Sequence, residues 1–329
     1  MFCVIVITKS FLSFPLIEGF YSDAVVGKYY LSRRRGCMRV SILTPQMLRV
    51  LFGIFRVKVG WFKYEWVQDC PLRECIAEAK RSGLDVFTFW QRFPNITPRY
   101  RWYTEWDCIA VLEVQQGYDH WWNNISKKTR NTIRKAKKKG VKVAIVELSK
   151  RFAEDVSKIY NETPWRRGKP FKHYGEKWNK IYENFLTLAD KATFIGAYYG
   201  EELIGFAVIE YTPEYSLISQ ILSLQKHMDK APNYALMDKI VEVCASRNIR
   251  YIIYERMQSE RDSLGFFKRR SGFKSVYVPR YFIPLTVKGL IALKIYQKVY
   301  PLLYVLMRVD CLKRFMRRLF HSVRRGWSV

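Results

Sequence analysis

Apolar and polar positions follow regular patterns between residues 141 and 285. Apolar residues at spacings of three or four predict amphipathic helices, whereas strict alternation and short apolar runs predict strands. Gly200 separates two strand patterns, which favours a hairpin there. The predicted order is β-α-α-β-β-β-α-β-α-β. These elements are strands at 141–147, 192–199, 202–211, 216–224, 251–255 and 274–285, and helices at 149–160, 174–189, 233–247 and 264–270.

The pattern N-terminal to this segment is less regular. Residues 38–117 contain short apolar runs separated by Pro and Gly, with one helix pattern at 71–82, and predict a small α/β unit. Residues 118–140 carry apolar side chains three or four apart and predict one long basic helix that bridges the two halves. Residues 1–37 end in a basic cluster and predict a poorly structured leader.

Composition narrows the classes of partner and location. The 329 residues are 49% apolar and 16% aromatic, which is enough to bury one or two cores and excludes global disorder. With 57 basic and 29 acidic residues the formal net charge is +28. This charge favours RNA, nucleotide-linked substrates or an anionic membrane surface. Seven scattered cysteines without a C-x-x-C pair predict no disulfide framework and no zinc site, and therefore a cytoplasmic location.

The C-terminal segment 286–329 combines an amphipathic helix pattern with a basic tail. Its longest uncharged run, 299–307, has nine residues, whereas a membrane-spanning helix needs about twenty. An apolar stripe next to clustered cations is typical of a helix on an anionic membrane surface. A helix docked on the catalytic domain, with a solvated tail, fits the pattern equally well. The stripe consists of Leu290, Leu293, Tyr296, Tyr300 and Leu303.

One motif points to a reaction. The run S-L-G-F-F-K-R-R-S-G-F at 263–273, with the element order, resembles the GNAT superfamily of acyltransferases over about residues 141–285. The resemblance implies an α/β fold with a GNAT-like mixed sheet flanked by helices, and a smaller, degenerate GNAT-like unit N-terminal to it. Ordinary members carry, four residues before the motif's Gly, a Tyr placed to protonate a departing thiolate. Here Lys268 stands at that position before Gly272.

The pair Phe267-Lys268 is similar to the Fem branch, the peptidoglycan-bridge aminoacyltransferases. That resemblance implies that Lys268 stabilises the oxyanion formed when an amine attacks an ester carbonyl, and that Phe267 contacts the substrate. The competing interpretation is that Lys268 is one more solvated charge among its basic neighbours.

The donor is left open by the segment 225–236. Enzymes that use coenzyme A normally carry Q/R-x-x-G-x-G/A there, so that backbone N–H groups bind the pyrophosphate. This chain lacks that loop and resembles the Fem-like pattern x-A-P-x-x-L. The donor is therefore either acyl-coenzyme A or aminoacyl-tRNA, with no prosthetic group and no metal implied. Candidate donor-binding residues are Lys226, Lys230 and Asn233.

The basic run 126–141 resembles the Fem-like helix that borders the acceptor's phosphates. Nine basic residues and no acid lie between Lys127 and Lys142. Arg130 and Arg134 are one turn apart, which predicts that they hold one phosphate group together. The alternative is a solvated or RNA-contacting helix face.

The loop 161–175 gathers charged and aromatic side chains among Gly and Pro residues, as functional loops often do. His173 is a candidate general base toward an acceptor ammonium; a structural histidine is the alternative. Glu210 and Glu255, near strand ends, are weaker candidates for the base. Candidate substrate-binding residues in the loop are Glu162, Arg166, Arg167 and Tyr174.

The sequence therefore predicts an N-acyltransferase. It would move an acyl or aminoacyl group to an amine of a phosphate-bearing or sugar- or lipid-linked acceptor, in the cytoplasm and peripheral to the membrane where the C-terminal stripe binds lipid. The alternative is a non-catalytic module that binds nucleic acid or a membrane surface on a GNAT scaffold.

Overall fold

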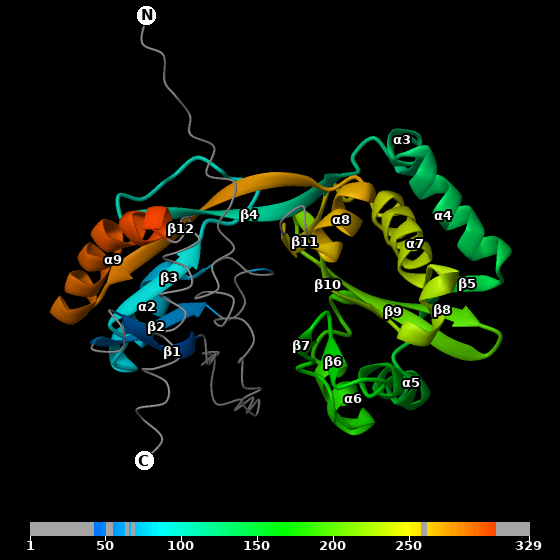
Figure 1. Ribbon diagram of the computed structural model, residues 1–329, viewed down its shortest axis with the longest axis horizontal. Helices are drawn as coiled ribbons and strands as arrows, with labels where there is room; N and C mark the ends of the chain where they lie inside the picture. The colour runs from blue at the N-terminus through cyan, green and yellow to red at the C-terminus, as the bar shows by residue number, and fades with distance from the viewer. Residues whose placement is uncertain (1–42, 51–54, 63–65, 67–69, 258–261, 307–329) are drawn as a thin grey trace, which may run out of the picture. The chain divides into compact units, whose positions relative to one another are not determined.

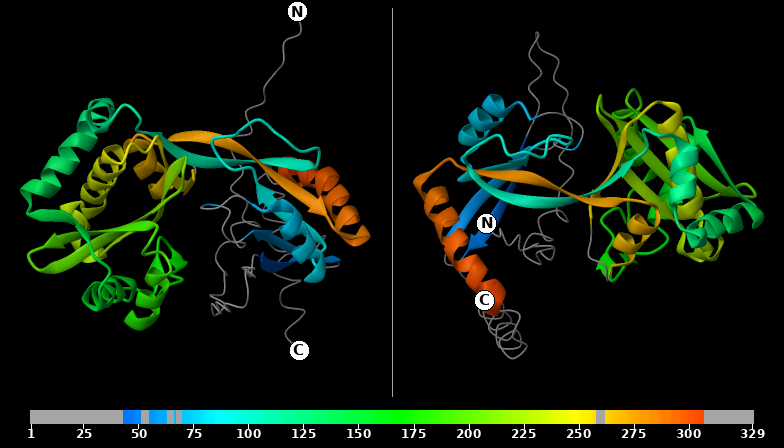
Figure 2. Two further views of the ribbon diagram at one scale, coloured as in Figure 1. Left: turned by 180° about the vertical axis from the view of Figure 1, so that it is seen from behind. Right: turned by 90° about the horizontal axis from the view of Figure 1, so that it is seen from above.

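The computed structural model describes residues 43–50, 55–62, 66, 70–257 and 262–306. Contacts group them into two compact units. Unit 1 comprises residues 107–278, and unit 2 combines the described residues before 107 with those after 278. Figures 1 and 2 show the elements of each unit. The predicted leader at 1–37 and the basic tail beyond residue 306 lie outside the described residues.

Unit 1 is built on a mixed sheet. Its elements, in chain order, are β4 (Tyr103–Glu113), α3 (Tyr118–Asn124), α4 (Lys127–Lys138), β5 (Val141–Val146), α5 (Lys150–Tyr160), β6 (Trp165–Arg166), β7 (Lys169–Pro170), α6 (Trp178–Leu186), β8 (Ala192–Tyr199), β9 (Glu202–Tyr211), β10 (Tyr215–Ser223), η1 (Gln225–Lys230), α7 (Pro232–Ser246), β11 (Tyr251–Arg256), α8 (Ser263–Arg270) and β12 (Lys274–Pro284). Strands β4 and β12 continue into unit 2. Within unit 1 the strand order includes β4-β11-β10-β9-β8-β5, in which only β10 and β11 run parallel.

Strand β9 shows how helices cover both faces of this sheet. Successive side chains of a strand point to opposite faces. Phe206 and Val208 belong to the cluster formed with α5 and α6, whereas Ala207 and Ile209 belong to the cluster formed with α7. Helices α3 and α4 pack in turn on α7 (Figure 1). The predicted α/β sheet flanked by helices is confirmed.

The elements predicted between 141 and 285 all occur. The predicted strands 192–199 and 202–211 match β8 and β9 to the residue, and Gly200 turns the hairpin with a φ of 60°. Helix α6 is shorter than predicted and begins at Trp178, after Gly175 in a left-handed conformation. The hairpin β6–β7 and the 3₁₀ helix η1 were not predicted, because two-residue strands and single turns leave no period in the sequence.

The single helix expected at 118–140 is wrong in one respect, because it is two helices. Ile125 is extended, and the Ser126 side chain accepts a hydrogen bond from the N–H of Thr129, which begins α4 as an N-cap. Both helices belong to unit 1. The Trp121 indole N–H donates to the carbonyl of Ser271 at 2.9 Å, so α3 holds the end of α8.

Unit 2 is a smaller sheet with a helix packed on each face. Its elements are β1 (Leu43–Val50), β2 (Phe55–Phe62), α2 (Leu72–Arg81), β3 (Val86–Trp90), the parts of β4 and β12 outside unit 1, and α9 (Val287–Leu306). The strand order is β1-β2-β3-β12. On one face Cys75 and Ala79 of α2 pack with Phe87 and Tyr281; on the other, α9 packs on β2.

Helix α9 corrects the prediction for the C-terminal stripe. Leu293 is buried with Ala292 against unit 2, and Tyr296 packs on the ring of Tyr103. The stripe therefore partly forms a core contact. The described part of segment 286–329 belongs to unit 2. The side chains of Tyr300 and Leu303 lie outside the described residues.

No helix within the described ranges is both long and apolar enough to cross a membrane. The same residues contain no cluster of His, Cys, Asp or Glu arranged to hold a metal ion. Cys75, Cys108 and Cys244 are free thiols.

Candidate active site

The two parallel strands of unit 1 separate at their carboxyl ends. β10 and β11 pair with each other over Tyr215–Leu217 and Tyr251–Ile253. Beyond these residues both strands continue, but they no longer pair with each other. On its other edge, β11 has an irregularity in its pairing with β4 between Ile253 and Arg256. Glu255, one of the two residues within this bulge, has a φ of 47°, which is uncommon for a residue with a side chain.

Lys268 occupies the edge of β11 where β10 no longer pairs with it. Its side chain is fully buried, and Nζ donates to the carbonyls of Tyr254 and Arg256 at 2.6 Å each. The ammonium also lies 4.3 Å from the centroid of the Tyr254 ring. Lys268 is therefore not a solvated charge, and one of the three ammonium donors is not used by these two bonds.

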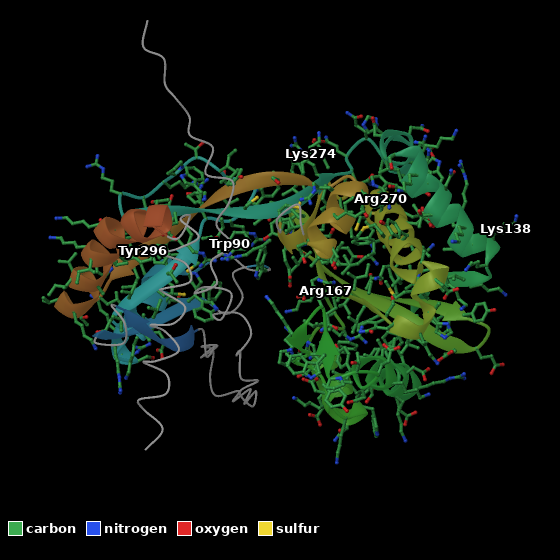
Figure 3. The ribbon with its side chains drawn as sticks, in the orientation of Figure 1. Trp90, Lys138, Arg167, Arg270, Lys274 and Tyr296 are labelled. Carbon is green, nitrogen blue, oxygen red and sulfur yellow. The ribbon has the colours of Figure 1, made fainter. Side chains whose placement is uncertain are left out.

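Burial lowers the pKa of Lys268 to about 7. The charge of Glu255 raises this pKa and that of Arg167 lowers it. Arg167 is at the tip of the hairpin β6–β7, again in a left-handed conformation with a φ of 53°, and is labelled in Figure 3. Three charged side chains from three elements thus act on one another at this edge.

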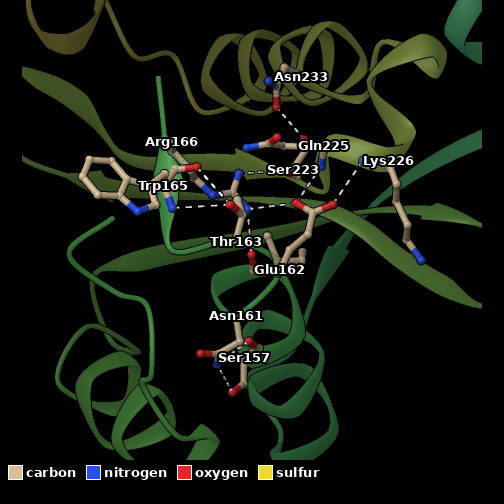
Figure 4. Close-up of polar contacts among 11 residues, drawn as sticks. Ser157, Asn161, Glu162, Thr163, Trp165, Arg166, Ser223, Gln225, Lys226 and Asn233 are labelled. Carbon is tan, nitrogen blue, oxygen red and sulfur yellow. Dashed lines mark hydrogen bonds and ion pairs between the residues drawn. The ribbon is translucent and has the colours of Figure 1, made fainter. Parts of the chain in front are cut away.

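The predicted residues Glu162 and Arg166 join the loop 161–175 to the end of β10. Glu162 accepts hydrogen bonds from the backbone N–H groups of Gln225 and Lys226 at 2.7 and 3.1 Å. Arg166 donates to the carbonyl of Ser223 and to Glu162 at 2.9 and 3.2 Å (Figure 4). Burial lowers the pKa of Arg166. In this structure both residues position the hairpin that carries Arg167.

His173 is held by its neighbours. Its Nδ1 lies 3.2 Å from Oε1 of Glu176, and its ring stacks on Tyr160 at 4.6 Å. Burial raises the pKa of Glu176, but hydrogen bonds to His173 and Lys180 and the charges of these two residues lower it. The net effect is a pKa below the ordinary value of a glutamate. The Tyr160 hydroxyl donates to Gln220 of β10 at 2.5 Å. Tyr174, beside His173, is exposed.

The two weaker candidates for the base differ in exposure. Glu210 is buried in β9, and this burial raises its pKa. Glu255 is exposed. Among the described residues Glu255 has no hydrogen bond or ion pair, whereas Asp107 and Asp262 are both engaged. Asp107 pairs with Arg256 at 3.0 Å, and Asp262 caps α8.

A pocket of about 380 Å³ opens at the start of α7. Tyr234 and Phe267 meet edge to face at 4.9 Å in its wall, and Lys135 lines it from α4. The backbone of Ala231 is in the left-handed conformation, and Pro232 is the first residue of α7. Because proline has no backbone N–H, this turn offers one hydrogen-bond donor fewer than a Gly-rich phosphate-binding loop would. The lining residues are Thr132, Lys135, Met228, Asp229, Ala231, Asn233, Tyr234 and Phe267.

The structure brings only some of the predicted binding residues to this pocket. Asn233 and Phe267 line it. Lys226 pairs with Glu202 at 2.5 Å, and Lys230 with Asp229 at 3.3 Å.

Both arginines of the predicted pair on α4, Arg130 and Arg134, contact residues of α3 or its end. Arg130 Nη1 donates to three backbone carbonyls at the end of α3, and the Arg134 guanidinium lies 5.4 Å from the Trp122 ring centroid. The sequence did not indicate that Lys135 and Tyr234 line this pocket. For Lys135 the signal was present, because the spacing of Thr129, Ile133 and Ala136 shows which face of α4 is buried.

One family model and several solved structures are similar to the chain. Residues 154–273 match the sequence model of the acetyltransferase (GNAT) family. No curated protein matches the chain. Among solved structures, FemX is 9% identical with a TM-score of 0.49, covering 76% of this chain and 86% of that chain.

Two further solved structures cover a similar share of this chain. The C-terminal domain of a putative lysylphosphatidylglycerol synthetase from Agrobacterium fabrum is 11% identical with a TM-score of 0.45, covering 77% of this chain and 89% of that chain. L-PGS from Bacillus licheniformis is 13% identical with a TM-score of 0.46, covering 77% and 84%. From the family match at 154–273, which spans the divergent strands and Lys268, the central part of unit 1 is an acyltransferase domain of the GNAT family.

Proposed function

We propose that the chain is an N-acyltransferase of the Fem-like branch, which moves an acyl or aminoacyl group to an amine of a phosphate-bearing or sugar- or lipid-linked acceptor. The single observation that carries the proposal is Lys268, a buried cation held at the edge where β10 and β11 separate. A cation fixed in a dry site is worth most where negative charge develops. Phe267-Lys268 is also the Fem-like element of the sequence.

In the proposed reaction the acceptor amine attacks the carbonyl carbon of a thioester or ester. Lys268 Nζ keeps two of its hydrogen bonds to the β11 carbonyls and gives its third to the developing oxyanion. The carbon–nitrogen bond forms and the bond to the leaving sulfur or oxygen breaks. No metal takes part in this scheme.

The pocket at the start of α7 supports a phosphate-bearing adenosine as the part of the donor that binds there. Both candidate donors, acyl-coenzyme A and aminoacyl-tRNA, contain this group. Aromatic rings such as Tyr234 and Phe267 suit a base, and Lys135 suits a phosphate. We therefore assign the donor phosphate to Lys135, and leave Arg130 and Arg134 as proposed contacts of the acceptor phosphate.

We expect Lys135→Ala to weaken the binding of adenosine 3′,5′-bisphosphate by about tenfold, because a charge-assisted hydrogen bond is lost. Titration calorimetry at low and high salt measures the effect. Lys138→Ala removes the same charge from an exposed position of α4 outside the pocket lining (Figure 3) and should change the affinity little. Equal affinities of the two variants would contradict the assignment, and competition by acetyl-coenzyme A or by charged tRNA identifies the donor.

A second candidate function is non-catalytic binding of nucleic acid, favoured by the basic surface of α4. A shallow depression there is lined by Lys127, Lys128 and Lys135 together with Asn131 and Thr132. Binding of RNA that depends on these lysines, in a protein without transfer activity toward any donor, would support it over the enzyme.

We further propose that this cytoplasmic enzyme acts at an anionic membrane surface through α9. Val287, Leu290 and Ile291 are 75%, 42% and 45% exposed, whereas Leu293 is buried. Lys294 continues the exposed face. Apolar side chains that insert and lysines that reach the headgroups are the two contributions that reversible binding needs.

Full-length protein should therefore sediment with vesicles of phosphatidylglycerol at low salt, and not with neutral vesicles. Leu290→Gln with Ile291→Gln should lower the bound fraction by about tenfold, because two exposed apolar side chains lose their insertion energy. The matched control, Ile145→Gln with Leu186→Gln, changes two exposed residues of unit 1. Full-length protein that stays in the supernatant with both lipids would refute membrane binding.

A further inference from the structure

The backbone at Glu255 is strained. A residue with a side chain in the left-handed region costs roughly 1–2 kcal/mol relative to the ordinary regions, and Gly is the usual residue at such bulge positions. Glu255 has a φ of 47° in the bulge of β11. Strain of this kind is found most often where a side chain must point in a particular direction for function.

The position of Glu255 ties it to the centre of the proposed reaction. It lies between Tyr254 and Arg256, whose carbonyls both bind Lys268 Nζ. Its carboxylate is exposed and, in the described part of the chain, has no hydrogen bond or ion pair. Glu210 is buried in β9 and His173 is held by Glu176, so of these three described candidates Glu255 is the one that remains available.

We infer that Glu255 is the general base of the acyl transfer and the residue that binds the acceptor's ammonium group. The inference rests on the proposed function and names the chemistry of the acceptor, a primary amine that enters protonated. An ammonium at Glu255 would lie next to the carbonyl whose oxygen Lys268 stabilises, which is the geometry that attack requires.

Glu255 handles both protons that the acceptor ammonium loses. Glu255 takes one proton from the ammonium, and the freed nitrogen lone pair forms the carbon–nitrogen bond while the carbonyl electrons move to the oxygen beside Lys268. When the tetrahedral intermediate collapses, Glu255 gives its proton to the departing sulfur or oxygen. It then takes the second proton from the nitrogen and releases it to water, leaving an amide, a neutral leaving group and one free proton.

Two substitutions separate chemistry from backbone strain. Glu255→Gln keeps the shape and the strained backbone but cannot accept a proton, and should lower turnover by about a hundredfold, within the range for loss of a general base. Glu255→Gly should be as inactive while its melting temperature is equal to or higher than that of the wild type, because Gly adopts a positive φ without a Cβ clash. The control, Glu183→Gln, makes the same substitution at an exposed position of α6 and should retain turnover within about threefold.

The assay follows transfer from acetyl-coenzyme A, or from a mixture of charged tRNAs, to phosphoethanolamine by mass spectrometry, with calorimetric binding of phosphoethanolamine measured in parallel. Wild-type turnover in Glu255→Gln, or an equal loss in Glu183→Gln, would overturn the inference. If the wild type transfers nothing from either donor, the proposed function fails and the binding arm decides on Glu255 separately. Weaker binding by Glu255→Gln then supports the ammonium contact, and equal binding refutes it.

Discussion

Replacement of Lys268 by Met is expected to lower turnover by about tenfold or more, because the oxyanion loses its fixed cation. The pH dependence should change as well. Burial lowers the pKa of Lys268 to about 7, so the side chain is charged below that pH and loses its proton above it. The ratio of the wild-type rate to the Lys268→Met rate should therefore be largest in mildly acidic solution and fall toward one as the pH rises through about 7.

The control must separate chemistry from folding, because Lys268→Met also leaves the carbonyls of Tyr254 and Arg256 without their donor. Such a loss costs about 1–3 kcal/mol, so circular dichroism at the assay temperature should establish that the variant is folded. Lys274→Met makes the same substitution at an exposed position (Figure 3) and should leave the rate unchanged. Equal rates for the wild type and folded Lys268→Met would remove Lys268 from the mechanism.

Trp121→Ala should lower the free energy of unfolding of unit 1 by about 3–5 kcal/mol, the usual cost of removing a large aromatic side chain from a core. Trp121 is 3% exposed, and its indole N–H donates to the carbonyl of Ser271. The next residue, Gly272, has a φ of 93°. Urea unfolding followed by far-ultraviolet circular dichroism measures the change.

The matched control is Trp165→Ala, because Trp165 is 58% exposed on the hairpin β6–β7. An exposed substitution of this kind should alter stability by about 0.5 kcal/mol or less. If both tryptophan variants lose the same stability, or if Trp121→Ala loses less than about 1 kcal/mol, α3 does not support the end of α8 as described.

Periodicity predicted the elements of unit 1 well because most of them have one clearly buried face. The strands 192–199 and 202–211 alternate or form apolar runs bounded by Gly200, and both match the structure. The break between α3 and α4 was missed because the apolar spacing continues through it. The Ser126 N-cap is the local signal that could have revealed the break.

The site was less predictable because its geometry depends on contacts between distant segments. The sequence could select Lys268 from its spacing to Gly272, but not the two β11 carbonyls that hold it. Likewise, Glu162 and Arg166 were recognisable as unusual loop residues, whereas their bonds to the backbone at the end of β10 required the fold. The strain at Glu255 comes from the pairing of β11 with β4, which no local pattern records.

Mass-spectrometric detection of N-acylated phosphoethanolamine, after incubation of full-length protein and phosphoethanolamine with acetyl-coenzyme A or with charged tRNAs, tests the proposed transfer reaction most directly. An amide product is expected from one of these donors with the wild type and with Lys274→Met, and folded Lys268→Met should form it about tenfold or more slowly. A wild-type protein that binds adenosine 3′,5′-bisphosphate and phosphoethanolamine yet forms no amide from either donor would contradict the proposed reaction.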